Sequence, residues 1–282
     1  MKINKFLKIG IIGFGRFGQF ISKKMVNNGF KVYATNRTNY SKIAKEIGVI
    51  FIEDSFLNLK EKLDIIIFCV SIFSFENILK SYPIDFWKNK LIVDVLSVKV
   101  YPQKILKNYL KNVECDILLT HPMFGPDSAK ESWRNKNFIW WIEKNNSDIC
   151  SNLYQTIIYN NSTKIDEKSK LDPIMIFLNF WKNEGCNMIE MNPEDHDKIS
   201  ANSQFLTHFI GRLLELLNCE ESNIDTDGYK SLLTIKKHTM NDSWDLFLAL
   251  AKFNPKSLET IKKIKNQLNH LEEIISSDVQ KN

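Results

Sequence analysis

The first half of the chain alternates short apolar runs with segments of helical hydrophobic spacing. The apolar runs are continuous rather than alternating, which is typical of strands buried on both faces of a parallel sheet. They cover residues 7–12, 31–35, 64–69, 91–95 and 115–119, and residues 188–191 are a candidate for a last strand. Amphipathic stretches between them, among them 19–28, 41–47 and 100–110, predict helices. This alternation predicts an α/β fold with a Rossmann-type, doubly wound parallel sheet over residues 1–192.

After Pro193 the apolar residues follow helical spacing instead, so about four helices are expected in an all-α domain over residues 193–282. The polar segment 160–170 is expected to be a loop. A helix starting at Pro193 has two faces. Its polar stripe is Asp197, Ala201, Gln204, His208 and Arg212, and its apolar stripe is Ile199, Leu206, Phe209, Leu213 and Leu217. Taken alone, this pattern predicts that the apolar stripe packs in the core and the polar stripe faces solvent.

Composition narrows the class of protein. The chain has 282 residues, 44% hydrophobic and 25% charged, which suits two globular domains. Its net charge of +5 is a mild excess without a basic run, so a small anionic ligand is favoured over nucleic acid. The five cysteines are scattered, so neither a disulfide framework nor a metal site is expected. With no signal-peptide pattern and no membrane-spanning apolar stretch, a cytoplasmic protein is expected.

A glycine-rich loop follows the first predicted strand directly. Its sequence is Gly13-Phe14-Gly15-Arg16-Phe17-Gly18, the G-x-G-x-x-G pattern of dinucleotide-binding loops. The first glycine permits the tight turn, the second lets a pyrophosphate approach the backbone, and the third lets helix and strand pack closely. The helix that follows presents unpaired N–H groups to the phosphates. The loop therefore predicts a dinucleotide cofactor.

The end of the second strand indicates which dinucleotide binds. NAD sites usually place Asp or Glu there, but this chain has Asn36, Arg37 and Thr38. An arginine with neighbouring hydroxyl and amide groups suits a 2′-phosphate, which a carboxylate would repel. NADP is therefore the expected cofactor, although Arg37 could also lie on an ordinary surface loop.

Five further segments follow the glycine loop in order. They are residues 94–99 (DVLSVK), 120–127 (THPMFGPD), 194–198 (EDHDK), 203–208 (SQFLTH) and 242–246 (DSWDL). Together they resemble the prephenate/arogenate dehydrogenases of tyrosine biosynthesis, most of all the plant-type arogenate branch, from Ile9 to about Leu268. The resemblance implies oxidative decarboxylation of arogenate to tyrosine with NADP⁺, or of prephenate to 4-hydroxyphenylpyruvate. It also implies a homodimer through the all-α domain, where several aromatic residues look exposed.

The resemblance assigns roles in catalysis and cofactor binding. His121, expected just past the strand 115–119, is implied to be the catalytic histidine that accepts the proton of the ring hydroxyl. Ser97, past the strand 91–95, is implied to bridge that hydroxyl and the nicotinamide; without the family it would be read as the N-cap of the helix from Val100. Cys69, Val70 and Ser71 are expected to complete the cofactor site.

The substrate contacts are implied in the same way. Gln204 and His208 are expected to face the substrate, with Asp127 standing where the family usually has Glu. Asp242 stands where the plant-type branch has an acid that attracts the ammonium of arogenate; its alternative role is the N-cap of a helix over 243–251. Thr226, a weaker candidate, is expected on the same side. No arginine lies between Asp225 and Phe253, so the partner of the ring carboxylate stays unassigned.

Two alternatives to this enzyme remain open. One is a different two-domain NADP oxidoreductase, such as a β-hydroxyacid dehydrogenase, although no lysine of the all-α domain stands in a recognisable motif. The other is a catalytically silent NADPH-binding protein, which would have no need of the pair formed by Ser97 and His121.

Overall fold

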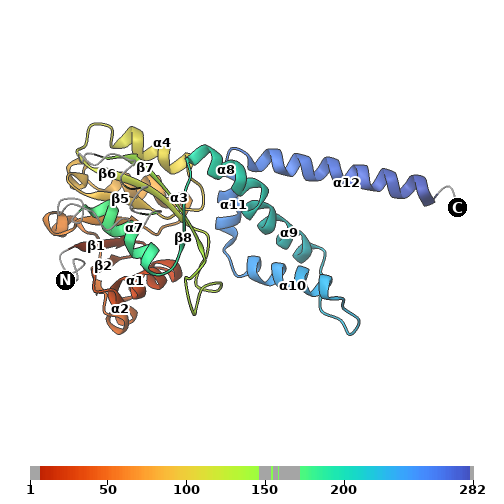
Figure 1. Ribbon diagram of the computed structural model, residues 1–282, viewed down its shortest axis with the longest axis horizontal. Helices are drawn as coiled ribbons and strands as arrows, with labels where there is room; N and C mark the ends of the chain where they lie inside the picture. Colours follow the sequence, from red (N-terminus) through yellow and green to blue (C-terminus); the bar gives the residue numbers. More distant parts are fainter. Residues whose placement is uncertain (1–6, 146–153, 155–157, 159–171, 280–282) are drawn as a thin grey trace. The chain divides into compact units, whose positions relative to one another are not determined.

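The computed structural model describes residues 7–145, 154, 158 and 172–279 (Figure 1). The chain divides into two compact units, an N-terminal unit, Met1–Pro193, and a C-terminal unit, Glu194–Asn282. The boundary expected from the sequence, between residues 192 and 193, lies one residue from this division. The segment 160–170 that was expected to be a loop lies outside the described residues.

The described residues of the N-terminal unit form one sheet of eight strands in the order β3-β2-β1-β4-β5-β6-β7-β8. The strands are β1 Lys8–Ile12, β2 Lys31–Thr35, β3 Ile50–Phe51, β4 Ile65–Phe68, β5 Leu91–Asp94, β6 Asp116–Pro122, β7 Asn137–Lys144 and β8 Asn187–Glu190. Each expected strand is present, whereas β3 and β7 were not expected. Strand β7 pairs antiparallel with β6 and parallel with β8, so the otherwise parallel sheet is mixed.

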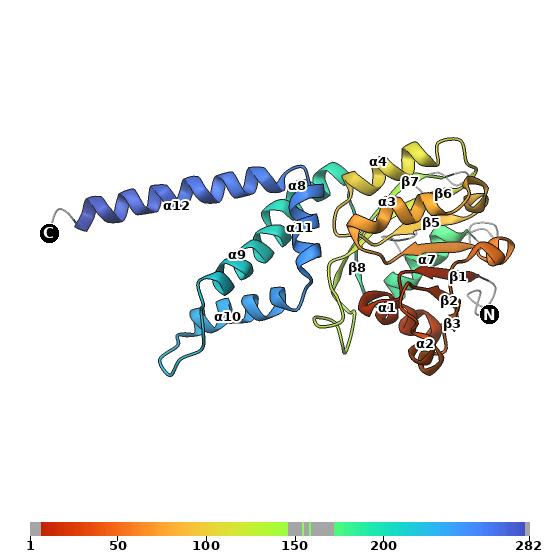
Figure 2. The ribbon, with the colours of Figure 1, turned by 180° about the vertical axis from the view of Figure 1, so that it is seen from behind.

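Helices cover both faces of this sheet (Figures 1 and 2). They are α1 Arg16–Asn27, α2 Ser41–Ile47, α3 Ile72–Ser81, α4 Val100–Tyr109 and α7 Pro173–Asn183, with short 3-10 helices at Leu57–Lys62 and Ile84–Trp87. Strand β4 shows why both faces need cover: all four of its side chains are buried, and successive side chains point to opposite faces. Ile65 and Ile67 join the core shared with α1 and α7, while Phe68 packs edge-on against Phe75 of α3.

An aromatic cluster anchors α7 on its side of the sheet. The Trp181 ring stacks on Trp133 at 4.8 Å and on Phe138 of β7 at 4.3 Å between ring centroids. The helix begins at Asp172, whose carboxylate accepts a hydrogen bond from the Met175 N–H at 2.9 Å. Because β7 supplies one wall of this cluster, the unexpected strand belongs to the core of the unit.

The C-terminal unit is all helical, as expected. Its helices are α8 Pro193–Asn202, α9 Gln204–Leu216, α10 Asp227–Met240, α11 Trp244–Phe253 and α12 Ser257–Val279 (Figure 1). Helices α9 and α10 form an antiparallel pair with a close backbone approach, since a Cβ atom at Gly211 would collide with the Thr239 hydroxyl. Among the described residues, no helix is both long enough and apolar enough to span a bilayer.

Two predictions for the first helix of this unit are wrong. The single helix expected from Pro193 is broken at Ser203, whose φ of −126° and ψ of −82° end α8 and allow α9 to start in a new direction. The predicted burial is also reversed at several positions of the two stripes. Ile199 and Leu217 of the apolar stripe are 54% and 63% exposed, whereas His208 and Arg212 of the polar stripe are buried.

The described cysteines agree with the expectation of free thiols. Cys69, Cys115, Cys186 and Cys219 form no disulfide, and Cys150 lies outside the described residues. Burial raises the pKa of the Cys115 thiol to about 11 and that of Cys186 to about 12, so both stay protonated at neutral pH.

Candidate functional site

The glycine loop lies between β1 and α1 and has the backbone that its pattern predicts. Gly13 has a φ of +99°, and a Cβ atom there would collide with the Cys69 carbonyl at the end of β4. A Cβ at Gly18 would collide with the Gly13 carbonyl oxygen, so this glycine lets α1 pack against the loop. At Gly15, by contrast, a Cβ would meet no atom within 4 Å. That open space beside the start of α1 fits a dinucleotide pyrophosphate.

The loop is held in place by side chains from the expected cofactor site. The Asn36 amide oxygen accepts a hydrogen bond from the Phe14 N–H at 3.0 Å, and the Gln19 amide donates to the Phe14 carbonyl at 2.9 Å. The Phe14 ring is buried against Tyr40 and Phe51, so its side chain packs in the core and is not offered to a ligand. Asn36 therefore fixes the loop, a role that the sequence did not reveal.

The structure places Arg37 and Thr38, which are expected to bind the ribose end of the cofactor, in exposed positions after β2. The structure adds an acid that the linear pattern missed. The Glu53 carboxylate, after β3, accepts a hydrogen bond from the Asn39 amide at 3.0 Å. Because β3 was not expected, nothing in the sequence placed Glu53 beside the loop that follows β2.

The remaining expected cofactor residues follow β4. Burial raises the pKa of the Cys69 thiol, which keeps it neutral. The Val70 side chain lies against the glycine loop, 2.9 Å from where a Cβ on Gly13 would stand. The Ser71 hydroxyl accepts a hydrogen bond from the Ser74 N–H at 3.3 Å and caps α3. Ser71 thus has a structural role at the mouth of the site.

The two expected catalytic residues come from neighbouring strands. His121 is inside β6 rather than past its end, since β6 continues to Pro122 and pairs His121 with Ile139 of β7. Its side chain is buried, with the residue 2% exposed. Ser97 is half-buried in the turn after β5. The alternative role of Ser97 as a helix cap is wrong, because α4 has Lys99 at its N-cap position and no side-chain cap.

Asp127, expected to contact substrate, instead pairs with the glycine loop. The Arg16 guanidinium donates from Nη2 to both carboxylate oxygens of Asp127 at 2.8 Å. Both side chains are largely exposed, so water screens the pair and its net stabilisation is small. A weak pair of this kind opens readily when a competing anion reaches Arg16.

In the C-terminal unit, His208 of α9 faces Asp242 in the turn between α10 and α11. The distance between His208 Nε2 and the Asp242 carboxylate is 3.7 Å. His208 is 7% exposed, and its buried Nδ1 has no hydrogen-bond partner among the described residues. Burial lowers the pKa of His208 below its ordinary 6.5, opposed by the Asp242 carboxylate and assisted by the Arg212 guanidinium. His208 is therefore neutral at pH 7 and does not neutralise Asp242.

Asp242 is not the helix cap that the sequence left open. The Ser243 hydroxyl takes that role, accepting a hydrogen bond from the Leu246 N–H at 3.1 Å at the start of α11. The Asp242 side chain is 43% exposed. Asp242 is therefore placed by its backbone, with its carboxylate partly open to solvent.

Arg212 holds that backbone. Its guanidinium donates to the Asp242 carbonyl at 2.7 Å and lies over the Trp244 ring, 5.0 Å from the centroid. The sequence pattern placed Arg212 on the solvent-facing stripe, but in the structure it fixes the turn that carries Asp242.

The structure does not bring all expected substrate residues together. Thr226 caps α10 through a hydrogen bond from the Tyr229 N–H at 3.2 Å. Asp242 follows the other end of this 14-residue helix, about 21 Å away. Thr226 therefore does not lie beside Asp242 within one chain, and its role as a substrate contact stays a prediction. Gln204 lies at the start of α9 and accepts a hydrogen bond from the Ser200 hydroxyl at 3.2 Å.

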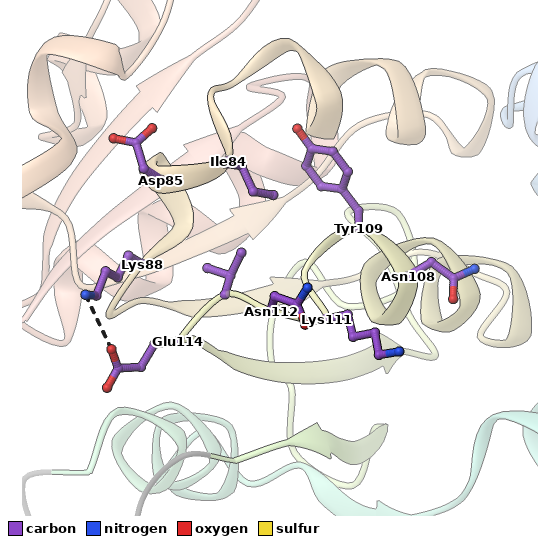
Figure 3. A pocket seen from close by; sticks show the side chains of 9 residues that line it. Ile84, Asp85, Lys88, Asn108, Tyr109, Lys111, Asn112 and Glu114 are labelled. Atoms are coloured by element: carbon purple, nitrogen blue, oxygen red, sulfur yellow. Dashed lines mark ion pairs between the residues drawn. The ribbon is translucent and has the colours of Figure 1, made fainter.

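A cavity of about 520 Å³ lies elsewhere in the N-terminal unit (Figure 3). Its lining residues are Ile84, Asp85, Lys88, Asn108, Tyr109, Lys111, Asn112, Val113 and Glu114. These residues precede β5 and β6, whereas Ser97 and His121 lie at or beyond the carboxyl ends of the same strands. An ion pair of 3.5 Å between Lys88 and Glu114 crosses one side of it, and no candidate residue lines it. This cavity is therefore separate from the candidate site.

Two family models match parts of the chain. Residues 8–98 match the NADP oxidoreductases described as coenzyme F420-dependent, and residues 213–282 match the TYRAAT1-like C-terminal domain. The first match spans the glycine loop and Ser97. The second spans Thr226, Asp242 and most of the helices of the C-terminal unit.

Curated proteins are similar over almost the whole chain. Arogenate dehydrogenase 2, chloroplastic, of Arabidopsis thaliana is 38% identical over 259 residues, which is 92% of this chain and 67% of the relative. Arogenate dehydrogenase 1, chloroplastic, of the same plant is 40% identical over 258 residues, 91% of this chain and 37% of the relative. The chain thus spans about two thirds of one relative and less than half of the other.

Solved structures share the fold at lower identity. Prephenate dehydrogenase from A. aeolicus, in complex with hydroxyphenyl propionate and NAD⁺, superposes with a TM-score of 0.67 at 18% identity. The match covers 97% of this chain and 92% of the other. The order of the two units along the chain is therefore that of a known two-domain architecture.

Proposed function

The chain belongs to the arogenate/prephenate dehydrogenase family, and we propose that this dehydrogenase converts L-arogenate to L-tyrosine by oxidative decarboxylation with NADP⁺. The identity of 38% over 92% of the chain is the observation that carries the proposal. The site geometry supports it, because a dinucleotide loop, a serine and a buried histidine occupy one edge of one sheet.

In the proposed reaction the protein handles the proton and the geometry. His121 accepts the proton of the ring hydroxyl as the carbon that bears it is oxidised. The Ser97 hydroxyl, which donates and accepts hydrogen bonds at once, holds that hydroxyl in line. The bound nicotinamide supplies the hydride acceptor. Carbon dioxide leaves from the opposite ring carbon, its bonding electron pair completes the aromatic ring, and the resulting phenolate oxygen takes the proton back from His121. Burial of His121 keeps bulk water from this proton acceptor.

The preference for arogenate rests on Asp242. Arogenate carries an ammonium group where prephenate carries a keto group, so a carboxylate favours the first substrate. Two observations support this role: Ser243 rather than Asp242 caps α11, and the lowered pKa of His208 leaves no positive imidazolium beside Asp242 at pH 7. Prephenate remains the alternative substrate.

The preference for NADP rests on Arg37 and Thr38 after β2, where an NAD site usually carries an acid. The match of residues 8–98 to NADP oxidoreductases agrees with it. Glu53, held by Asn39, is the group that would weaken this preference if it reached the ribose. Measured affinities for NADP⁺ and NAD⁺ decide whether Arg37 and Thr38 or Glu53 has the larger effect on cofactor preference.

We also propose that the protein is a homodimer joined through its C-terminal unit. Several apolar side chains of this unit are exposed in the single chain, among them Leu216, Leu217, Leu258, Leu268, Leu271 and Ile275. Exposed apolar surface of this extent is typical of an interface. Light scattering after size-exclusion chromatography measures the mass directly. The expected cytoplasmic location stays a prediction, and the names of both plant relatives place those proteins in the chloroplast.

The deciding experiment measures four initial rates. Arogenate and prephenate are each supplied with NADP⁺ and with NAD⁺, while absorbance of the reduced nicotinamide and formation of tyrosine are followed. The proposal predicts the highest kcat/KM for arogenate with NADP⁺. A higher kcat/KM for prephenate would move the function to prephenate dehydrogenase. Absence of turnover in all four, with NADPH still bound, would identify the silent cofactor-binding protein.

A further inference from the structure

The turn that carries Ser97 and the end of β6 that carries His121 are joined by more than the sheet ladder. Strands β5 and β6 are parallel neighbours, with Asp94 opposite Leu119 in register. Ser97 follows Asp94 by three residues, and His121 follows Leu119 by two. Backbone pairing of these two strands is recorded up to Asp94, so the register alone does not hold Ser97.

A network of side chains spans the gap. The Lys99 ammonium donates to the Asp94 carboxylate and, at 2.6 Å, to the backbone carbonyl of Thr120. The Thr120 hydroxyl donates to the Asp94 carbonyl, also at 2.6 Å. The Asp94 carboxylate further accepts the Leu96 N–H at 3.1 Å. Asp94 and Lys99 thus lie on either side of Ser97 in the sequence, and both form hydrogen bonds with Thr120, the residue before His121.

The two charges are taken almost completely out of water. The side chains of Lys99 and Asp94 are 2% and 0% exposed. Removing an ammonium and a carboxylate from solvent costs so much free energy that apolar residues of similar size commonly give equal or greater stability. Stability alone therefore does not account for a buried charged pair at this position. The geometry of the pair, which ties the turn after β5 to the end of β6, does account for it.

A matched lysine at the other end of β5 shows what a purely structural contact looks like. Lys90 is also buried, and its ammonium donates to the Lys60 carbonyl at 2.5 Å and lies 5.6 Å from the centre of the Phe86 ring. It stands at the amino edge of the sheet, where no candidate residue lies. Both lysines bind a backbone carbonyl of another segment, but Lys99 alone of these two borders the proposed site.

We infer that Lys99 and Asp94 form a buried strap that sets the position of Ser97 relative to His121, which makes both of them positioning residues for hydride and proton transfer. The inference rests on the proposed function for the identity of the two catalytic residues. It goes beyond that function because Lys99 and Asp94 touch neither the substrate nor the cofactor in the proposed mechanism.

The test uses a variant that removes the strap and keeps the fold. D94N/K99M deletes both charges together, so no uncompensated charge stays buried. The amide introduced at position 94 retains an acceptor for the Leu96 N–H, and the thioether side chain introduced at position 99 fills the space of the lysine stem. T120V is a second, nearly isosteric variant that removes only the hydroxyl donor to Asp94. K90M is the matched control.

If the strap positions Ser97 relative to His121, its removal should lower kcat and leave KM unchanged. For D94N/K99M, kcat should fall about 10- to 100-fold, the effect of a misplacement of about 1 Å. The KM for substrate, the Kd of NADPH and the melting temperature should stay close to those of the wild type. T120V should lower kcat less. K90M should lower the melting temperature and leave kcat unchanged. A wild-type kcat in D94N/K99M, or an equal loss of kcat in K90M, would overturn the inference.

A second readout keeps the strap testable if the wild type oxidises neither arogenate nor prephenate, which would refute the proposed function alone. The chain has five histidines, so the imidazole signals of His121 can be assigned in NMR spectra with H121N. The strap predicts that these signals shift or broaden in D94N/K99M and stay in place in K90M. Unmoved His121 signals in a folded D94N/K99M would overturn the inference whatever the activity.

Discussion

Each unit contains one histidine that the sequence singled out, and the two are held in different ways. His121 lies within β6 and is paired with Ile139 of β7, so the backbone ladder holds its main chain. His208 lies on a helix and is surrounded by side chains, with Asp242 at 3.7 Å and a buried Nδ1 without a described partner. The ladder holds the main chain of His121 whatever the neighbouring side chains are, whereas the whole setting of His208 depends on the side chains around it. In the proposed function, the chemistry belongs to the residue held by the sheet and the substrate preference to the residues held by side chains.

The strongest test of this contrast replaces each histidine in turn. H121N should lower kcat by about 10²–10⁴-fold, the usual contribution of a general base, while NADPH binding stays intact. H208N should act mainly on the KM for arogenate. Steady-state kinetics and NADPH fluorescence titration measure both effects. If the two variants lost kcat equally, the division of labour between the units would be refuted.

The next largest effect concerns the choice of substrate. D242N should lower kcat/KM for arogenate by about 10- to 100-fold, because the ammonium loses its charged partner, and should change kcat/KM for prephenate little. T226A is the matched control. It removes the cap of α10 at a cost of about 1 kcal/mol in unfolding free energy but leaves the ratio of the two kcat/KM values unchanged. A change in that ratio for T226A would restore Thr226 as a substrate contact.

A smaller effect should appear on acidification. Since the pKa of His208 is lowered in the folded protein, the ring becomes protonated only below pH 6.5, and the imidazolium then competes with the substrate ammonium for Asp242. The KM for arogenate should rise there by up to about fivefold, the equivalent of an ion pair worth about 1 kcal/mol. A pH series of KM measures this rise, and H208N should abolish it.

The same pKa shift has a consequence for stability. Below pH 6.5 the unfolded chain binds a proton at residue 208 that the folded chain resists, which favours unfolding. The free energy of unfolding is therefore unaffected by this group above pH 6.5 and decreases as the pH falls toward the lowered folded pKa of His208. Denaturant titrations of the wild type and H208N at pH 7.5 and 5.5 give this difference. An equal loss in both proteins would assign the acid sensitivity to other groups.

The smallest effect belongs to the surface pair of the glycine loop. D127N should change the free energy of unfolding by less than about 1 kcal/mol, because both partners are exposed and screened. It should also leave the KM for substrate unchanged if Asp127 serves Arg16 rather than substrate. Thermal melts and kinetics check both statements, and a large increase in KM would return Asp127 to the substrate site.

The parts of the fold that local sequence determines were predictable. The continuous apolar run Ile65–Phe68 and the spacing of Gly13, Gly15 and Gly18 encode a buried strand and a phosphate loop without help from distant residues. Strand β7 was not expected, although its residues 138–142 (FIWWI) form a continuous apolar run like those of the predicted strands. His121 was expected just past the end of its strand because pairing with β7, which extends β6 to Pro122, was not expected.

The C-terminal unit shows where helical periodicity fails. Ser203 is compatible with a helix, so nothing local announced the break that separates α8 from α9. The helical pattern predicts that Arg212 faces solvent, but in the structure its guanidinium lies over the ring of Trp244, thirty-two positions later in the sequence. Contacts between elements decide burial here, and a hydrophobic stripe alone does not record them.

The close approach at Gly211 also determines how the α9–α10 hairpin tolerates change. Because a side chain at residue 211 would collide with Thr239, this contact sets the alignment of the two helices independently of the connection between them. Closing a longer connection costs little free energy. The exposed turn that includes Ser222 and Ile224 can therefore accept an inserted tag or a fluorophore without displacing Asp242, which makes it a practical position for labelling a working enzyme.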